Sequence, residues 1–204
     1  MSWYTSITLG YVSKTDGKIY PFGPFDKDGN LKNIIETSRS FTTDLKDFFE
    51  VPNAEVVSQK LVDALDIKVK DGENLSQALR EYYIGVCPLD KLPSGDYMRR
   101  GYFLIEDVHA YESGEMDAEG LFYDCVSAEE YAARAHNELV FGFKEEKDEF
   151  GNVVNHSMAD YMYYSYPNYQ SKEYEASRLR DYAATLRNYL EEDIKEIVAI
   201  KTEG

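Results

Sequence analysis

A regular spacing of apolar residues between positions 171 and 199 constrains the fold of this chain more than any other feature. Apolar side chains recur there at steps of three and four, which places them on one face of an α-helix. The residues in this stripe are Leu179, Ala183, Leu186, Leu190, Ile194 and Ile197. The spacing predicts one long C-terminal amphipathic helix that packs its stripe against a sheet. The same stripe could instead pair two chains into a homodimer.

Several other segments carry strand patterns. Along residues 3–12, large apolar side chains recur at alternate positions, as on one face of a strand. Residues 15–18 contain the Asp-Gly pair of a tight hairpin turn. Segment 97–111 has the strongest strand pattern and predicts a central strand. The tyrosine-rich segment 160–169 predicts an aromatic strand beside the long helix. A second hairpin is expected around the loop 144–152, with Gly151 in its turn.

Helical patterns at 75–84 and 127–139 interleave irregularly with these strands, and hairpin turns outnumber crossover connections. We therefore expect an α+β fold with a mostly antiparallel sheet packed against helices, rather than a doubly wound fold. A chain of 204 residues fits one domain, 1–204, that can bury a substantial core. The loop 85–96 contains two prolines and a Ser-Gly pair, so a subdomain boundary would fall there.

Charge is concentrated in one part of the chain. The net charge is −16, and residues 106–149 alone contain 14 acidic and 3 basic residues. Such a field repels nucleic acid and anionic membranes, and it attracts basic proteins or cations. We therefore expect neither direct nucleic-acid binding nor membrane binding.

Carboxylates spaced along a surface can imitate a phosphate backbone, and tyrosines supply rigid contact area beside them. This combination predicts a binding surface for a basic or nucleic-acid-binding partner protein. Negative charge that serves only solubility is the alternative interpretation. The candidate partner-binding residues are Glu112, Glu115, Asp117, Glu119, Glu129, Glu130, Glu145, Glu146, Asp148, Glu149, Tyr161, Tyr163 and Tyr169.

Sequence patterns that would indicate a catalytic site are weak. Glu106, Asp107 and Glu112 lie near the end of the predicted central strand, where the carboxylates of a small metal-dependent hydrolase could lie. Cys125 could act as a thiol nucleophile if a histidine folded beside it, but the sequence favours buried free thiols for Cys87 and Cys125. We find no phosphate-binding loop or nucleophile motif, and we expect a protein without a cofactor.

Metal-binding patterns are incomplete. Asp26, Asp28 and Asn30 match the first three ligand positions of a calcium loop, but Leu31 stands where that loop requires glycine. The three histidines have no metal-ligand spacing. The sequence therefore predicts a plain turn at 26–30 and no metal site.

The N-terminal start lacks a basic region followed by an apolar run, and no segment has the roughly 18 apolar residues of a membrane span. Two cysteines are too few for a disulfide framework. The chain is therefore expected in a reducing cytoplasm.

Three segments within about the first 50 residues are WYTSITLGY at 3–11, YPFGPFD at 20–26 and ETSRSFT at 36–42. With these segments the N-terminal part of the chain resembles uncharacterised small proteins of bacteriophages and prophages. The resemblance contains no catalytic motif and implies a viral accessory role in the cytoplasm of a bacterial host. Inhibitors of host nucleases, of the anti-CRISPR or anti-restriction type, are a common role of this kind. The expected function is therefore a non-catalytic inhibitor, with a hydrolase or a structural assembly protein as alternatives.

Overall fold

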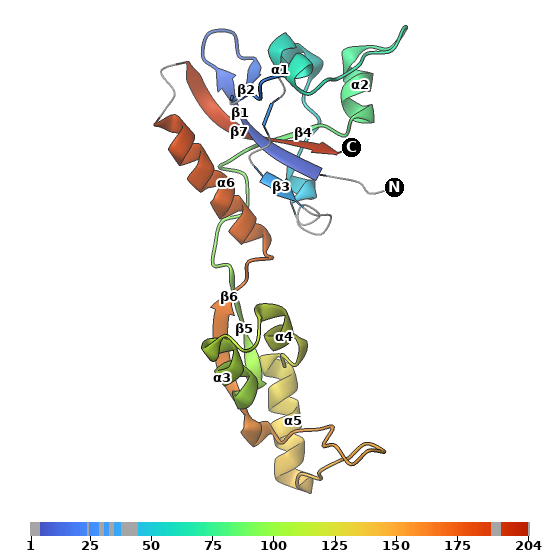
Figure 1. Cartoon of the computed structure of the whole chain (residues 1–204), viewed down its shortest axis with the longest axis vertical. Coiled ribbons are helices and arrows are strands. Elements are labelled where there is room, and N and C mark those ends of the chain that lie inside the picture. The colour runs from blue at the N-terminus through green and yellow to red at the C-terminus, as the bar shows by residue number, and fades with distance from the viewer. Residues whose placement is uncertain are drawn as a thin grey trace. The chain divides into compact units, whose positions relative to one another are not determined.

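The structure is a computed structural model that describes residues 5–23, 25–28, 31–32, 35–37, 45–188 and 193–203. The chain forms two compact units (Figure 1). Unit 1 contains residues 1–96 and 169–204, and unit 2 contains residues 97–168. Unit 2 is therefore inserted into the sequence of unit 1, and the chain passes from unit 1 to unit 2 after residue 96. The expected loop 85–96 lies directly before this point, although its first residues, Gly85–Pro88, form a strand, β4, rather than a loop.

Unit 1 is built on an antiparallel sheet. Its strands run in the order β2-β1-β7-β4, and β3 also pairs with β1. The hairpin of β1 and β2 confirms the predicted turn, in which Gly17 adopts a φ of 72° that favours glycine. The strands are β1 (Thr5–Ser13), β2 (Ile19–Pro21), β3 (Ile35–Thr37), β4 (Gly85–Pro88) and β7 (Ile194–Glu203).

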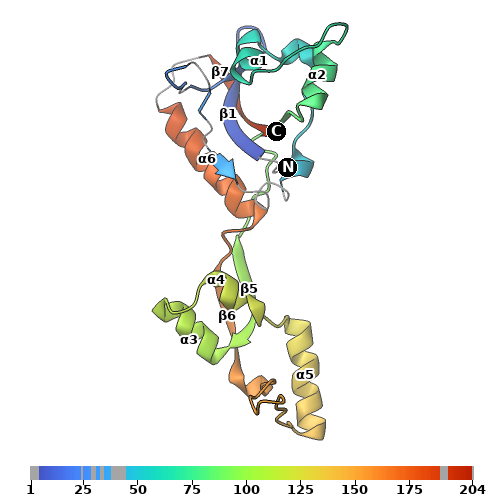
Figure 2. The same cartoon turned by 45° about the vertical axis from the view of Figure 1, so that its right-hand side comes forward.

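Side chains alternate between the two faces of each strand, and both faces of this sheet are buried because helices pack on each. Ile197 and Ala199 of β7 join the core cluster that includes Leu179 of α6 (Lys172–Arg187). Val198 and Ile200 join the opposite cluster, which includes residues of α1 (Gln59–Ala64) and α2 (Leu75–Glu81). Figures 1 and 2 show α6 on one side of the sheet and α1 and α2 on the other. The 3₁₀ turns η1 (Lys46–Phe48) and η2 (Ala54–Val56) complete the described helices of the unit.

The prediction of one helix over 171–199 is wrong. Helix α6 ends at Arg187, and Ile194–Glu203 is strand β7 of the sheet. Ile194 and Ile197 fit the helical spacing, but residues 197–200 are an unbroken apolar run that a strand buries on both faces. Leu190 lies outside the described residues.

Unit 2 is built on a two-stranded antiparallel ribbon of β5 (Met98–Leu104) and β6 (Tyr161–Pro167). Phe103, Val108, Leu121 and Tyr166 form its small core. The described helices of this unit are α3 (Ile105–Ser113), α4 (Ala118–Tyr123), α5 (Ala128–Phe141) and the 3₁₀ turn η3 (Met158–Asp160).

The prediction of a central strand over 97–111 is also wrong. The strand ends at Leu104, and the chain continues directly into α3. Glu106 and Asp107 occupy the first turn of α3, where carboxylates interact favourably with the positive end of the helix dipole. The tyrosine-rich segment does form a strand, β6, but β6 pairs with β5 in unit 2, whereas α6 belongs to unit 1.

The α+β class is nevertheless as predicted, with antiparallel sheets and helices in both units. Among the helices that the structure describes, none combines the length and the apolar character needed to cross a lipid bilayer.

Candidate protein-binding surface

Unit 2 contains most of the charge imbalance of the chain. Residues 97–168 include 15 acidic and 5 basic residues, a net charge of −10, and all three histidines. Of the thirteen candidate partner-binding residues, twelve lie in unit 2 and only Tyr169 lies in unit 1. The structure therefore assigns nearly the whole predicted surface to the smaller unit.

The candidate acidic residues around α3 and α4 are exposed. Glu112, near the end of α3, accepts a hydrogen bond from the Tyr164 hydroxyl at 3.2 Å. Asp117 caps α4 by accepting from the Gly120 backbone N–H at 2.8 Å. Glu115 and Glu119 are exposed to solvent on either side of this cap. Their carboxylates can face a partner, whereas that of Asp117 also holds the helix start.

The acidic residues at the start of α5 are exposed as well. Ser127 is the N-cap of α5, and its hydroxyl accepts from the Glu130 N–H at 3.1 Å. The Glu130 carboxylate forms an ion pair with Arg134 one turn later. Glu129 points from the first turn into solvent. The first turn of α5 therefore adds two carboxylates to the surface, one of them paired within the helix.

Helix α5 is attached to unit 2 along one side only. The Tyr131 ring stacks on Tyr102 with centroids 3.7 Å apart, and its hydroxyl donates to the Met158 carbonyl oxygen. One turn before the end of the helix, the Glu138 carboxylate accepts from the Ser157 hydroxyl and the Met158 N–H, each at 2.9 Å. None of the fourteen residues of α5 is buried. Most of the helix surface is thus available to a partner.

The segment after α5 forms the predicted second turn, although its first expected strand is the end of the helix itself. The Asp148 carboxylate accepts from the backbone N–H groups of Phe150 and Asn152 at 2.9 and 2.8 Å. Asn155 ties the end of the segment to its start: its side-chain oxygen accepts from the Glu146 N–H, and its side-chain nitrogen donates to the Lys144 carbonyl oxygen. The hydrogen bonds from Asn152 lower the pKa of Asp148. Asp148 therefore organises the turn.

The carboxylates that flank this turn are exposed. Glu145 forms an ion pair with Lys147 at 2.9 Å, and Glu146 and Glu149 face solvent. These three residues can present negative charge to a partner, a role for which Asp148 is less suited.

The three candidate tyrosines differ in exposure. Tyr163 is 56% exposed and meets the edge of the Tyr102 ring. Tyr161 is half-buried, and burial raises the pKa of its hydroxyl. Tyr169 is exposed in unit 1, where it contacts Tyr174. Tyr163 is thus the candidate tyrosine best placed for contact within unit 2.

An exposed apolar group at the end of α5 was missed by the sequence reasoning. We define the apolar tip as five residues, each more than half exposed: Leu139, Val140, Phe141, Phe150 and Val154. The first three end α5, and the other two belong to the segment that follows it in the chain. Figures 1 and 2 show where α5 ends and this segment begins. The hairpin expected around the loop 144–152 takes Val140, Phe141 and Val154 as residues of the flanking strands. Leu139 instead belongs to the predicted helix 127–139, and Phe150 to the loop itself.

The carboxylates of the hydrolase alternative do not meet at a strand end. Glu106 and Asp107 lie in the first turn of α3, and Glu112 lies near its last turn. An open hollow of about 490 Å³ instead brings Glu106 together with His109, His156 and Asp160. Within the described ranges, no three His, Cys, Asp or Glu side chains are arranged to hold a metal ion.

The thiol groups are poorly suited to nucleophilic catalysis. Cys87 is buried, and burial raises its thiol pKa to about 11. Burial also raises the pKa of Cys125, although Arg99 opposes this shift. Both thiols are therefore protonated near neutral pH, whereas a nucleophilic cysteine needs its thiolate form.

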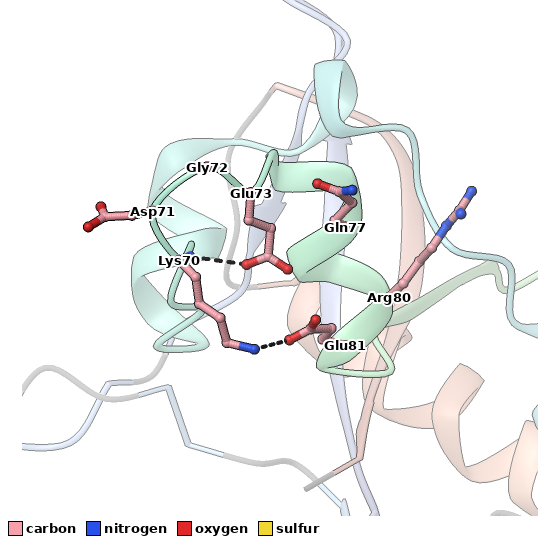
Figure 3. A pocket seen from close by; sticks show the side chains of 7 residues that line it. All are labelled: Lys70, Asp71, Gly72, Glu73, Gln77, Arg80 and Glu81. Carbon is pink, nitrogen blue, oxygen red and sulfur yellow. Dashed lines mark hydrogen bonds and ion pairs between the residues drawn. The ribbon is translucent and has the colours of Figure 1, made fainter.

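A polar hollow of about 480 Å³ in unit 1 lies beside α2 (Figure 3). The Glu73 carboxylate accepts from the Lys70 N–H at 3.0 Å, and the Lys70 ammonium pairs with Glu81. Figure 3 shows Asp71 and Arg80 pointing away from this pair. The Lys70 and Glu81 charges thus neutralise each other, and the Glu73 carboxylate already has a backbone partner.

At 26–28, the Asp26 carboxylate accepts from the Asp28 N–H at 2.8 Å, as in a plain turn, and Asn30 lies outside the described residues.

No protein-family model matches the chain, and comparisons with curated proteins and with solved structures find no match either.

Proposed function

We propose that the chain is a phage-type, non-catalytic inhibitor that acts in the cytoplasm of a bacterial host. In this proposal it binds a basic, nucleic-acid-binding defence protein through the acidic side of unit 2. The observation that carries the proposal is the combination of a net charge of −10 in unit 2 with a helix, α5, that has no buried residue.

Electrostatics favour this class of partner. Glu115, Glu119 and Glu129 are exposed and come from three successive segments of unit 2. Their charges add to a field that speeds encounter with lysine- and arginine-rich surfaces and opposes encounter with nucleic acid. A protein with such a field can occupy the nucleic-acid site of its partner by presenting carboxylates where phosphates would lie.

The test is capture of partners from a bacterial lysate by the immobilised protein. We expect basic nucleic-acid-binding proteins to be retained at about 50 mM salt and released at about 500 mM, because salt screens exposed charges. Duplex DNA should compete for the same partner. Reversal of Glu115, Glu119 and Glu129 to lysine should abolish capture without changing the circular dichroism spectrum.

The matched control reverses Glu55, Asp63 and Asp71, which are exposed carboxylates of unit 1. Both triple variants change the net charge equally, so only the location of the charge differs. Equal loss of capture in the two variants would mean that total charge, rather than the surface of unit 2, attracts the partner.

A small hydrolase is the second candidate function, and the hollow that contains Glu106, His109, His156 and Asp160 is the observation that favours it. Burial, together with the nearby Asp124 and Glu106 carboxylates, raises the pKa of the adjacent Asp107. Raised carboxyl pKa values occur at catalytic sites as well as in crowded acidic surfaces.

Calorimetric titration with magnesium, manganese and calcium separates these two functions. The inhibitor proposal predicts no saturable heat with any of the three ions. A saturable site that is lost in Glu106→Gln and retained in Glu119→Gln would favour the hydrolase. Glu119 serves as the control because it is exposed on α4, in the same unit and away from the hollow.

A further inference from the structure

We infer that the apolar tip is the anchor by which unit 2 grips its partner, and that its occupant is a basic amphipathic segment of the partner protein. Such a segment carries apolar side chains between lysines and arginines. The inference rests on the proposed function, because it names the part of the same surface that supplies affinity and specificity.

The largest side chains of the apolar tip are strongly exposed to solvent. Leu139, Phe141 and Phe150 are 85%, 78% and 81% exposed. Water-soluble chains bury most large apolar side chains, and those left exposed together often mark a contact with another molecule. Aromatic and aliphatic anchors that become buried contribute most of the binding energy in protein interfaces, whereas exposed rim charges contribute little.

The backbone that supports the tip is held by specific hydrogen bonds. Gly142 ends α5 with a φ of 77°, and its N–H donates to the Glu138 carbonyl oxygen at 2.8 Å. The Asp148 N–H donates to the Asn152 carbonyl oxygen at 2.9 Å, and the Val154 N–H donates to the Glu146 carbonyl oxygen at 3.0 Å. Apolar residues on a backbone that is already ordered lose less conformational entropy on binding.

Charge complementarity identifies the occupant. Residues 138–149 contain five acidic and two basic residues, so carboxylates lie between the tip residues along the chain, and Glu145, Glu146 and Glu149 among them are exposed. Glu145, Glu146 and Glu149 would meet lysines and arginines while the tip meets apolar side chains. A second copy of this chain would bring another net charge of −10 against the first, which disfavours self-association.

The experiment measures binding of two synthetic helical peptides to the full chain by fluorescence anisotropy at about 150 mM salt. One peptide contains lysine and leucine in an amphipathic pattern, and the other has serine in place of every leucine. We expect the lysine–leucine peptide to bind at least tenfold more tightly. That preference should disappear in the double variant Leu139→Ser, Phe150→Ser, while binding of the lysine–serine peptide stays unchanged.

The matched control is Tyr123→Ser. Tyr123 is 87% exposed on α4 of the same unit but lies outside the tip, so this variant should keep the preference. A second tip variant, Phe141→Ser with Val154→Ser, repeats the test if the first is not folded by circular dichroism.

Three other results of the peptide and sedimentation experiments would contradict the anchor or the proposed function. Equal affinity for the two peptides, or a preference that survives both tip variants, would overturn the anchor while leaving the electrostatic proposal intact. Failure of the lysine–serine peptide to bind even at about 20 mM salt would contradict the proposed function itself. A dimer in sedimentation that the tip variants dissociate would assign the tip to a second copy instead.

Discussion

Asp193 shows at the residue scale how one carboxylate joins two distant segments of unit 1. It accepts hydrogen bonds from the Ser13 hydroxyl and from the backbone N–H and hydroxyl of Thr15, the latter two at 3.0 Å. The end of β1 is thereby tied to the start of β7. These bonds, that from Ser13 foremost, lower the pKa of Asp193.

This arrangement predicts a pH-dependent effect of Asp193→Asn. Because the pKa of Asp193 is lower in the folded chain, its stabilising contribution is present above the unfolded value of about 3.9 and is lost as the pH falls through the folded value. The variant should melt at a lower temperature than the parent at pH 7, and the difference should shrink below about pH 4. Thermal denaturation across this range, with Asp90→Asn as a control in an exposed turn, measures it. A difference that does not change with pH would contradict the account.

Asp148 has a different role from the one that its place in an acidic run suggests. The sequence placed it among the partner-binding carboxylates because it lies in an acidic run. The structure shows its oxygens accepting from Phe150 and Asn152, as an aspartate that organises a turn does. Its position four residues before Asn152 and three before Gly151 was a usable signal for that role. Charge alone does not separate a carboxylate that builds a turn from one that faces solvent.

At the scale of elements, α6 is the main helix on one face of the unit 1 sheet. Ala176, Leu179 and Ala183 recur at helical spacing and are buried in the core cluster with Ile197 and Ala199 of β7. Leu179 is 0% exposed. The part of the predicted stripe that lies before residue 187 therefore does form the core face of a helix.

Leu179→Ala should lower the free energy of unfolding by about 2–5 kcal/mol, because it removes apolar contacts and leaves a cavity. Tyr182→Ala is the matched control, since Tyr182 is 40% exposed on the same helix and should cost far less. Urea denaturation measures both. Equal losses in the two variants would show that the stripe does not face the core.

The sequence predicts an element well when the spacing of its apolar residues fits only one kind of secondary structure. The alternation of β1 and the Asp-Gly turn at 16–17 allow only one local structure, and both predictions were right. Ile194 and Ile197 satisfy a helical step, yet they also begin the apolar run of a strand buried on both faces. Only pairing of β7 with β1 and β4, which are distant in sequence, decides between the two.

The candidate site was only partly predictable for the same reason. Its acidic residues follow directly from the charge distribution, and they lie exposed in unit 2. The exposure of the apolar tip was not predicted, because Val140, Phe141 and Val154 were expected in hairpin strands. The structure continues α5 to Phe141 instead, and no described side chain of that helix is buried. Burial of an apolar run cannot be read from the run alone.

At the scale of the whole molecule, the chain divides its properties between two units. Unit 1 holds the five-stranded sheet with helices on both faces, and unit 2 holds a small core, the exposed α5 and most of the charge imbalance. The sequence of unit 2 enters between β4 and α6 of unit 1. This division is consistent with a stable scaffold that carries a separate binding unit, as the proposed function requires.

The most direct test of that claim is the association rate with the captured partner, measured by stopped-flow fluorescence from about 50 to 500 mM salt. The account predicts that the rate falls at least tenfold over this range, because encounter depends on exposed charge. It also predicts that reversal of Glu115, Glu119 and Glu129 slows association, whereas reversal of Glu55, Asp63 and Asp71 does so much less. A tight complex that forms equally fast at every salt concentration and with both charge-reversed variants would contradict the account.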